Sequence, residues 1–322
     1  MIYKGLRTFI GSRQKGGFSM KHLLGIKELT AQDIVKVLDR ADTMKREVLN
    51  GSKKDNCLSG KSIVTLFYEN STRTRLSFEL ASKYLGATAA NITASGSSVE
   101  KGETLPDTGK TIDAMGADVV IIRHSSSGAP HMLSNYTNAS VVNAGDGMNE
   151  HPTQALLDFM TIRENFGSFE GLKVSIIGDV KHSRVARSDI YGLNKLGAKV
   201  TLCGPSTLMP SEIESMGVRV CDDADVAIQD ADVVMGLRIQ LERQKSGLFP
   251  SVREYHKMFG INKRRMALAK PNAIVMHPGP VNRGVELAAD VADGPQSVIV
   301  EQVTNGVCVR MAILDMLTHG EL

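Results

Sequence analysis

The sequence predicts an α/β protein with two doubly wound parallel-sheet domains joined by connecting helices. Short apolar segments rich in β-branched residues alternate with helical patterns along the chain. Near-continuous apolar strands separated by helices are typical of parallel sheets that are covered on both faces. The strands form two successive sets, and 322 residues are enough for two domains of ordinary size.

The expected strands of the first set are 62–67, 88–92, 118–123 and 141–144, and those of the second set are 173–177, 199–203, 218–221, 232–237 and 273–276. Between the sets, Leu156, Leu157 and Met160 recur at helical spacing, and Pro152 suits a first helical turn. One connecting helix is therefore expected over residues 152–166.

These elements place the first domain at residues 20–152 and the second at 153–304. Val309, Ile313 and Met316 lie along one face of a final helix, expected over 306–319. We expect this C-terminal segment, 305–322, to pack back on the first domain.

Residues 1–19 are basic and rich in glycine, and they lack the apolar core of a secretory signal. The chain from Met20 onward resembles an ordinary N-terminus. A dispensable extension or an alternative start is our interpretation of these nineteen residues, and a transit peptide is the alternative.

Composition excludes several classes of function. The 38 basic and 35 acidic residues leave a net charge of +3, without the basic stripe of a nucleic-acid-binding protein. No apolar stretch approaches the length of a membrane-spanning helix. The four cysteines form no C-x-x-C pair, which disfavours a zinc site or disulfides and favours a cytoplasmic protein.

Polar clusters follow the expected strands, at 69–75, 123–124, 146–154, 178–187, 238–243 and 277–283. Ligands of parallel sheets collect at the carboxyl ends of the strands, so these loops are the candidate site. In the first cluster, hydroxyls and guanidinium groups crowd a helix start that Ser71 is expected to cap. Unpaired N–H groups and the helix dipole suit a phosphate dianion there, whereas a capped surface helix with incidental arginines is the alternative.

The string Ser-Thr-Arg-Thr-Arg at 71–75 resembles the carbamoyl phosphate loop of the aspartate/ornithine carbamoyltransferase family. His-Pro-Thr-Gln at 151–154 and Lys-Gly-Glu-Thr at 101–104 match that family in order and spacing. The resemblance extends from Met20 essentially to the C-terminus. It implies that 20–152 bind carbamoyl phosphate and that 153–304 bind the amine acceptor.

The resemblance implies a role for each matching residue. The expected carbamoyl phosphate ligands are Ser71, Thr72, Arg73, Thr74, Ser97, Lys101, Arg123, His151, Gln154, Pro278 and Gly279. His151, Arg123 and Thr74 would stabilise the carbonyl oxygen, while Arg73 and Lys101 complete the catalytic set. Residues 95–102 have no apolar periodicity and would otherwise be interpreted as a surface loop. The family implies that this loop, with Ser97 and Lys101, reaches the active site of a neighbouring subunit in a homotrimer.

The second half indicates the acceptor. Arg184 begins a helix after a glycine turn, but the dinucleotide fingerprint G-x-G-x-x-G is missing there. Residues 236–243, with Arg238 and Gln240, resemble the aspartate loop of the family, and no cysteine follows His277 as it does in ornithine enzymes. The expected aspartate ligands are therefore Lys101, Arg184, Arg238 and Gln240.

The resemblance implies transfer of a carbamoyl group from carbamoyl phosphate to L-aspartate, an early step of de novo pyrimidine biosynthesis. No metal or cofactor is expected, because phosphate is a good leaving group and can take the amine proton. A regulatory or dihydroorotase chain would be compatible as a partner. The alternatives are a carbamoyltransferase with another acceptor, such as ornithine, and a non-catalytic sensor of phosphate ligands.

Overall fold

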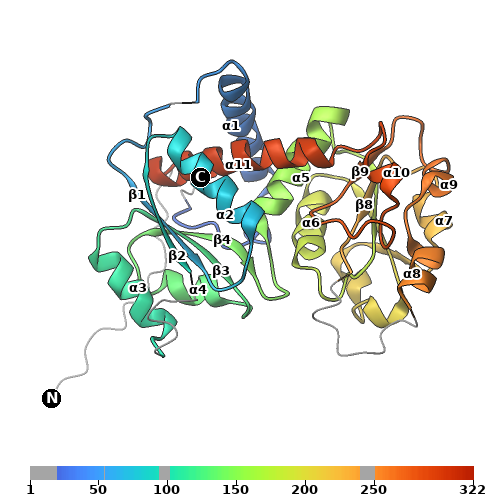
Figure 1. The fold of residues 1–322 in the computed structure, drawn as a ribbon, viewed down its shortest axis with the longest axis horizontal. Coiled ribbons are helices and arrows are strands. Elements are labelled where there is room, and N and C mark those ends of the chain that lie inside the picture. Colours follow the sequence, from blue (N-terminus) through green and yellow to red (C-terminus); the bar gives the residue numbers. More distant parts are fainter. Residues whose placement is uncertain (1–19, 54, 94–101, 240–250) are drawn as a thin grey trace.

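The structure is a computed structural model that describes residues 20–53, 55–93, 102–239 and 251–322. Two α/β domains lie side by side, and two helices pass between them (Figure 1). Ser97, Lys101, Gln240 and the segment 1–19 fall outside the described residues.

The first domain contains a parallel sheet with the strand order β2-β1-β3-β4. Its strands are β1 (Ser62–Phe67), β2 (Thr88–Thr93), β3 (Val119–His124) and β4 (Ser140–Asp146). Its helices are α1 (Ala31–Leu49), α2 (Thr72–Tyr84), α3 (Leu105–Ala114) and α4 (Ala129–Ser134). The central strands are buried on both faces, since Val119, Val120, Ile121 and Ile122 are all inaccessible to solvent.

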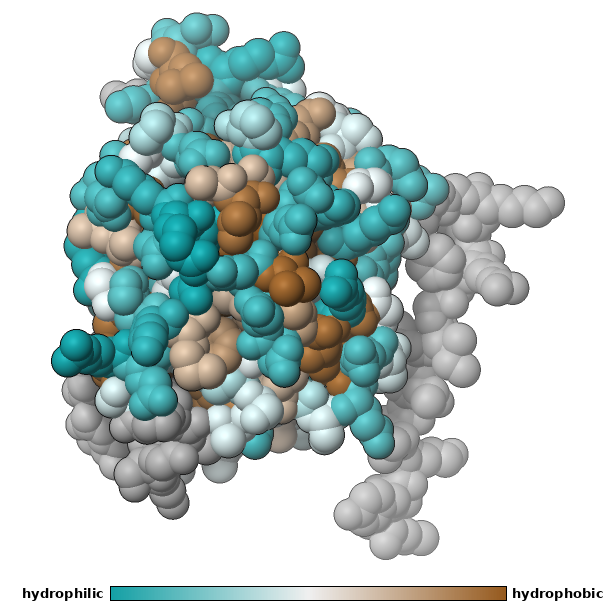
Figure 2. Space-filling model, turned by 90° about the vertical axis from the view of Figure 1, so that its right-hand side faces the viewer, coloured by the Kyte–Doolittle hydropathy of each residue, from teal (hydrophilic) through white to brown (hydrophobic). Residues whose placement is uncertain are grey.

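The second domain contains a parallel sheet with the order β7-β6-β5-β8-β9. Its strands are β5 (Lys173–Ile177), β6 (Lys199–Cys203), β7 (Arg219–Cys221), β8 (Val233–Gly236) and β9 (Ile274–Met276). Its helices are α6 (Arg184–Lys195), α7 (Ala224–Ile228), α8 (Val252–Phe259), α9 (Lys263–Met266) and α10 (Ala289–Ala292). The outer end of this domain is mostly hydrophilic, with apolar side chains scattered among polar ones (Figure 2).

The helices α5 (Pro152–Phe166) and α11 (Ile299–His319) join the domains and pack against each other. From the second domain, α11 runs back over α1 and α2 of the first (Figure 1). There Asp315 forms an ion pair of 2.6 Å with Nε of Arg40. On the other side of the junction, the Lys195 ammonium donates to the carbonyls of Ile26, Lys27 and Leu29.

The predicted fold class is confirmed, and each expected strand is present within a few residues of its predicted bounds. The last helix was predicted to begin at Gly306, but it begins at Ile299. The first turns of α11 are exposed at Val300, Glu301, Val303 and Thr304. They therefore lack the apolar face that marks the rest of the helix in the sequence.

The contact between α5 and α6 depends on a glycine. A Cβ atom on Gly192 would overlap the ring of Phe159, which is fully buried. The backbone of α6 can approach α5 this closely only because residue 192 has no side chain.

We predict that Gly192→Ala destabilises the protein by about 1–3 kcal/mol, because Phe159 must leave its packed position. Alanine favours a helix interior over glycine by about 1 kcal/mol, so helix propensity alone would give the opposite sign. Urea denaturation measures the free energy of unfolding, and an unchanged or raised value would contradict this account of the contact.

Candidate active site

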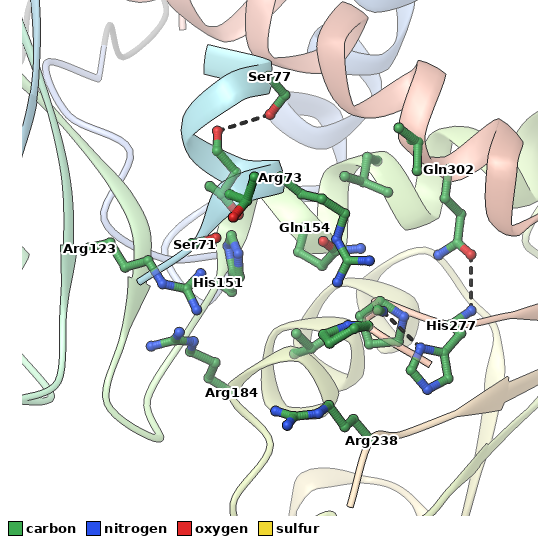
Figure 3. Close-up of a pocket in the computed structure, with 18 of the residues that line it drawn as sticks. Ser71, Arg73, Ser77, Arg123, His151, Gln154, Arg184, Arg238, His277 and Gln302 are labelled. Atoms are coloured by element: carbon green, nitrogen blue, oxygen red, sulfur yellow. Dashed lines mark hydrogen bonds between the residues drawn. The ribbon is translucent and has the colours of Figure 1, made fainter. Parts of the chain in front are cut away.

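A cavity of about 770 Å³ lies where the carboxyl ends of both sheets face the junction between the domains. Each polar segment expected at a strand end contributes to its lining. The first domain supplies residues 69–74, Arg123 and His151, and the connecting helix α5 supplies Gln154. The second domain supplies Ser183, Arg184, Arg238 and residues 277–280. The structure thus brings the described candidate residues together around one space (Figure 3).

The N-terminus of α2 faces this cavity. Ser71 has the extended backbone of an N-cap residue, but its side chain makes no capping hydrogen bond, contrary to the expected cap. Its hydroxyl and the first N–H groups of α2 are therefore available to a ligand. Thr72, Arg73 and Thr74 line the cavity beside it, whereas Arg75 is exposed and lies outside the lining.

His151 is the N-cap residue of α5 and is almost fully buried. Its backbone N–H donates to Oγ of Ser188 on α6 at 2.8 Å, which fixes this turn against the second domain. No described residue forms a hydrogen bond with Nδ1 of the ring. Burial, together with the charges of Arg123, Arg184 and Arg310, holds the pKa of His151 well below its ordinary value. The imidazole is therefore neutral and can donate one N–H.

Glu69 connects the cationic groups of the two domains. Its Oε2 atom lies 2.8 Å from Nη2 of Arg184 and 3.3 Å from Nε of Arg123. Arg123 comes from the end of β3, and Arg184 begins α6. The carboxylate at the β1–α2 loop thus holds two arginines of the site beside each other across the junction.

Arg73 and Arg238 approach the same cavity from opposite domains. Burial and the charge of Arg238 lower the pKa of Arg73. The Arg73 guanidinium lies against the backbone of Gly279, where a Cβ atom would overlap it. Gly279 also has a φ of 67°, which favours glycine.

The loop after β9 is braced by a buried pair. His277 Nε2 lies 3.2 Å from Oε1 of Glu286, and its Nδ1 accepts from the N–H of Gly279 at 2.8 Å. Glu286 also accepts from the N–H of Asn282. The Glu286 carboxylate thus holds His277 and the following turn together.

Sequence reasoning missed three residues that line or support the cavity: Arg310, Gln302 and Asp158. Arg310 is buried on α11, packs over the ring of Phe78 at 5.0 Å and extends toward the cavity. Asp158 is buried on α5 and accepts from the amides of Gln154 and Gln302. Arg310 and Asp158 are charged residues within the apolar faces of their helices, whereas Gln302 is neutral and lies in the first turns of α11. For the two charged residues, that mismatch was the available signal.

Among the described lining residues are five arginines and a single carboxylate, Glu69. This excess of positive charge suits ligands that carry several negative charges. No described group of three or more histidine, cysteine or acidic side chains could hold a metal ion. No described helix is long and apolar enough to cross a membrane. The fold and the site define a two-domain α/β protein with a cationic cavity at the domain junction, which suits a phosphate-bearing ligand beside a second anionic group.

Comparison with known proteins identifies the family. The profile described as "Aspartate/ornithine carbamoyltransferase, carbamoyl-P binding domain" matches residues 21–164, and "Aspartate/ornithine carbamoyltransferase, Asp/Orn binding domain" matches residues 170–317. The aspartate carbamoyltransferase catalytic subunit of Acetivibrio thermocellus is 66% identical over 94% of this chain and 96% of its own length.

Solved structures agree with this result. Aspartate transcarbamoylase from Trypanosoma cruzi, in complex with carbamoyl aspartate and phosphate, has a TM-score of 0.82 and 33% identity over 91% of this chain and 95% of that chain. Ornithine carbamoyltransferase from Pyrococcus furiosus has a TM-score of 0.81 and 32% identity over the same shares. The chain belongs to the aspartate/ornithine carbamoyltransferase family, and it is a carbamoyltransferase.

The environment of His151 makes the free energy of unfolding depend on pH in a way that can be tested. Its folded-state pKa lies below the value of about 6.5 expected in the unfolded chain. The unfolded chain therefore takes up a proton near that pH while the folded state does not. The free energy of unfolding falls as the pH drops through this range, and above it His151 contributes no pH dependence.

We predict that the ring resonances of His151 in an NMR titration do not shift between about pH 8 and pH 6 in the ligand-free protein. Added phosphate should raise the pKa, because its charge offsets those of the arginines. A midpoint near the ordinary value for histidine without ligand would show that the ring is not held neutral.

Proposed function

We propose that this chain transfers the carbamoyl group of carbamoyl phosphate to the amine of L-aspartate. The supporting observation is a single cavity that the α2 N-terminus, Arg73, Arg123 and His151 line together with Arg184 and Arg238 of the second domain. The first group suits a phosphate and a carbonyl, and the second suits two carboxylates. A relative that is 66% identical is named as the aspartate enzyme, which supports this acceptor.

The proposed reaction is direct attack. The neutral amine nitrogen of aspartate bonds to the carbamoyl carbon, and negative charge grows on the carbonyl oxygen. The C–O bond to phosphate then breaks, and the leaving phosphate takes a proton from the amine. Thr74, Arg123 and the N–H of neutral His151 stabilise the oxyanion. One such donor can contribute about 3 kcal/mol to the barrier. Gln154 accepts a hydrogen bond from the carbamoyl NH₂, and the carbonyls of Pro278 and Gly279 face the amine.

The charges of the second subsite favour aspartate over ornithine. Aspartate brings two carboxylates, and two arginines, Arg184 and Arg238, line this side of the cavity. Ornithine would bring a side-chain cation that Arg238 repels. The fold itself does not separate the two activities, since both kinds of enzyme match with similar TM-scores.

Arg73→Ala should lower kcat/KM by roughly 10²–10³-fold, because an aligned cation at the phosphate is lost. Its melting temperature should stay close to that of the wild type, since solvent still reaches much of the Arg73 side chain even though its guanidinium is partly buried. Arg75→Ala is the matched control from the same turn, and it should remain active because Arg75 lies outside the cavity lining. Near-normal turnover of a folded Arg73→Ala protein would reject the phosphate role.

Phosphate release in the presence of carbamoyl phosphate should occur with aspartate and not with ornithine. Succinate keeps both carboxylates but lacks the amine, and it should compete with aspartate. Arg238→Ala should raise the KM for aspartate about tenfold or more, with a much smaller effect on the KM for carbamoyl phosphate. Preferential carbamoylation of ornithine would overturn the choice of acceptor, and no turnover with any amine would favour the sensor alternative.

We also propose a homotrimer in which Ser97 and Lys101 of one subunit complete the cavity of its neighbour. Lys101 contributes to binding both substrates, and Gln240 of the same chain as Arg238 orients aspartate. The enzyme would act in the cytoplasm at an early step of pyrimidine biosynthesis. A regulatory or dihydroorotase chain would join the trimer in a larger assembly.

Shared sites can be tested by complementation. Lys101→Gln and His151→Ala chains should each form nearly inactive trimers. After dissociation and joint reassembly, some cavities should combine an intact His151 with an intact Lys101 from a neighbour, so activity should appear. Sites made within a single chain could not be repaired in this way. If mixed trimers form and activity stays at the parental level, the shared-site proposal is wrong.

A further inference from the structure

Gln154 lines the cavity from the first turn of α5, and its amide group has a defined neighbour. Its Nε2 atom lies 3.1 and 3.3 Å from the two carboxylate oxygens of Asp158, one turn further along α5. Asp158 is inaccessible to solvent. The nitrogen end of the Gln154 amide is therefore engaged inside the protein.

Asp158 has a second amide partner on α11. Nε2 of Gln302 donates to its Oδ1 at 2.6 Å, and Oε1 of Gln302 accepts from the backbone N–H of His277 at 3.0 Å. A chain of hydrogen bonds thus runs from Gln154 through Asp158 and Gln302 to the loop after β9. Figure 3 shows Gln154 and Gln302 on the two helices, with the Gln302–His277 hydrogen bond drawn.

The donor and acceptor of each hydrogen bond in this series follow from elementary chemistry. An ionised carboxylate only accepts hydrogen bonds, whereas an amide donates from nitrogen and accepts at oxygen. Both glutamines must therefore turn their NH₂ groups toward Asp158. The N–H of His277 fixes the oxygen of Gln302 on the far side, and the oxygen of Gln154 remains as an acceptor for a ligand.

We propose that Asp158 is a positioning residue that holds the Gln154 amide with its oxygen toward the carbamoyl NH₂ and couples this orientation to the His277 loop. The inference rests on the proposed function, because it assigns a carbamoyl group to that part of the cavity. Asp158 touches no substrate and acts only through the two glutamines.

Charged groups around Asp158 support its role as an acceptor. Burial raises the pKa of Asp158 to about 7, although the hydrogen bonds from Gln302 and Gln154 and the charge of Arg310 oppose that rise. Asp189 on α6 is the other buried carboxyl here. Neither of its oxygens has a hydrogen-bond partner among the described residues. Burial and the charge of Asp158 raise the pKa of Asp189 well above its ordinary value. Asp158 has the donors, so of the two carboxyls it is the one that holds the charge above about pH 7, while Asp189 holds the proton.

Asp158→Asn tests the proposal, because asparagine offers one acceptor and one donor to two amide NH₂ groups. Gln302 is fixed by the N–H of His277, so Gln154 must turn and present its NH₂ to the ligand NH₂. The probes are phosphonoacetamide, a stable compound with the same carboxamide, and inorganic phosphate, which has none. Affinity for phosphonoacetamide, measured by calorimetry, should fall roughly tenfold or more, and affinity for phosphate should change by less than about twofold.

A second variant restores the direction of the hydrogen bonds along this chain without restoring an aspartate at position 158. In Asp158→Asn with Gln302→Glu, the carboxylate at position 302 accepts from the N–H of His277 and from the new amide at 158. The oxygen of that amide then accepts from Gln154. Affinity for phosphonoacetamide should return to within about threefold of the wild type. Gln302→Glu alone is the matched control. It keeps Asp158 as the acceptor for Gln154, because one of the two facing carboxyls takes up a proton, so it should bind phosphonoacetamide more tightly than Asp158→Asn does.

Equal losses of both ligands in Asp158→Asn, or a double variant no better than the single one, would overturn the positioning role. The proposed function fails separately. The wild type could bind phosphonoacetamide more tightly than phosphate and yet form no carbamoyl aspartate. In that case the proposed activity is wrong, but the affinities of the variants for the two probes still test the role of Asp158. If the wild type does not distinguish the two probes, both proposals fall.

Discussion

The ion pairs of Glu69 with Arg123 and Arg184 are the contact on which the rest of the site depends. Several guanidinium groups lie around one cavity, and the carboxylate between Arg123 and Arg184 offsets part of their mutual repulsion. Glu69 lies at the end of β1, so the arginines of both domains are held in place before any ligand arrives. A dianionic ligand would then meet cationic side chains that are already in position, so these side chains need little reorganisation to bind it.

The same electrostatics determine the state of His151. A histidine near bound phosphate could in principle be protonated, but three arginines and the loss of water favour the neutral ring. Neutrality matters because a fixed N–H donor stabilises a developing oxyanion without releasing its proton to the substrate. The cations thus have two effects. They attract the anions, and they keep the neighbouring imidazole in the form that suits carbonyl polarisation.

Most of the fold and much of the cavity could be predicted from the sequence. The strands are marked by apolar runs, and Ser71–Arg75, Arg123 and His151 stand at strand ends or helix starts, where local pattern is informative. Asp158, Gln302 and Arg310 could not be assigned in this way, because their partners lie on helices more than a hundred residues apart. Periodicity identifies which face of a helix is buried, but it does not say which polar side chains meet there. The early start of α11 was missed for a related reason, since its first turns have no apolar face.

The path of α11 has a consequence for chain connectivity. After the second domain is complete, this helix returns across the junction, and the carbonyl of Leu322 accepts a hydrogen bond from the N–H of Met20. The second domain is therefore an insertion within the first, tethered at both of its ends. Met20, the first described residue, and Leu322 therefore lie next to each other on the first domain. A circularly permuted chain joined there and opened elsewhere would preserve every element that lines the cavity.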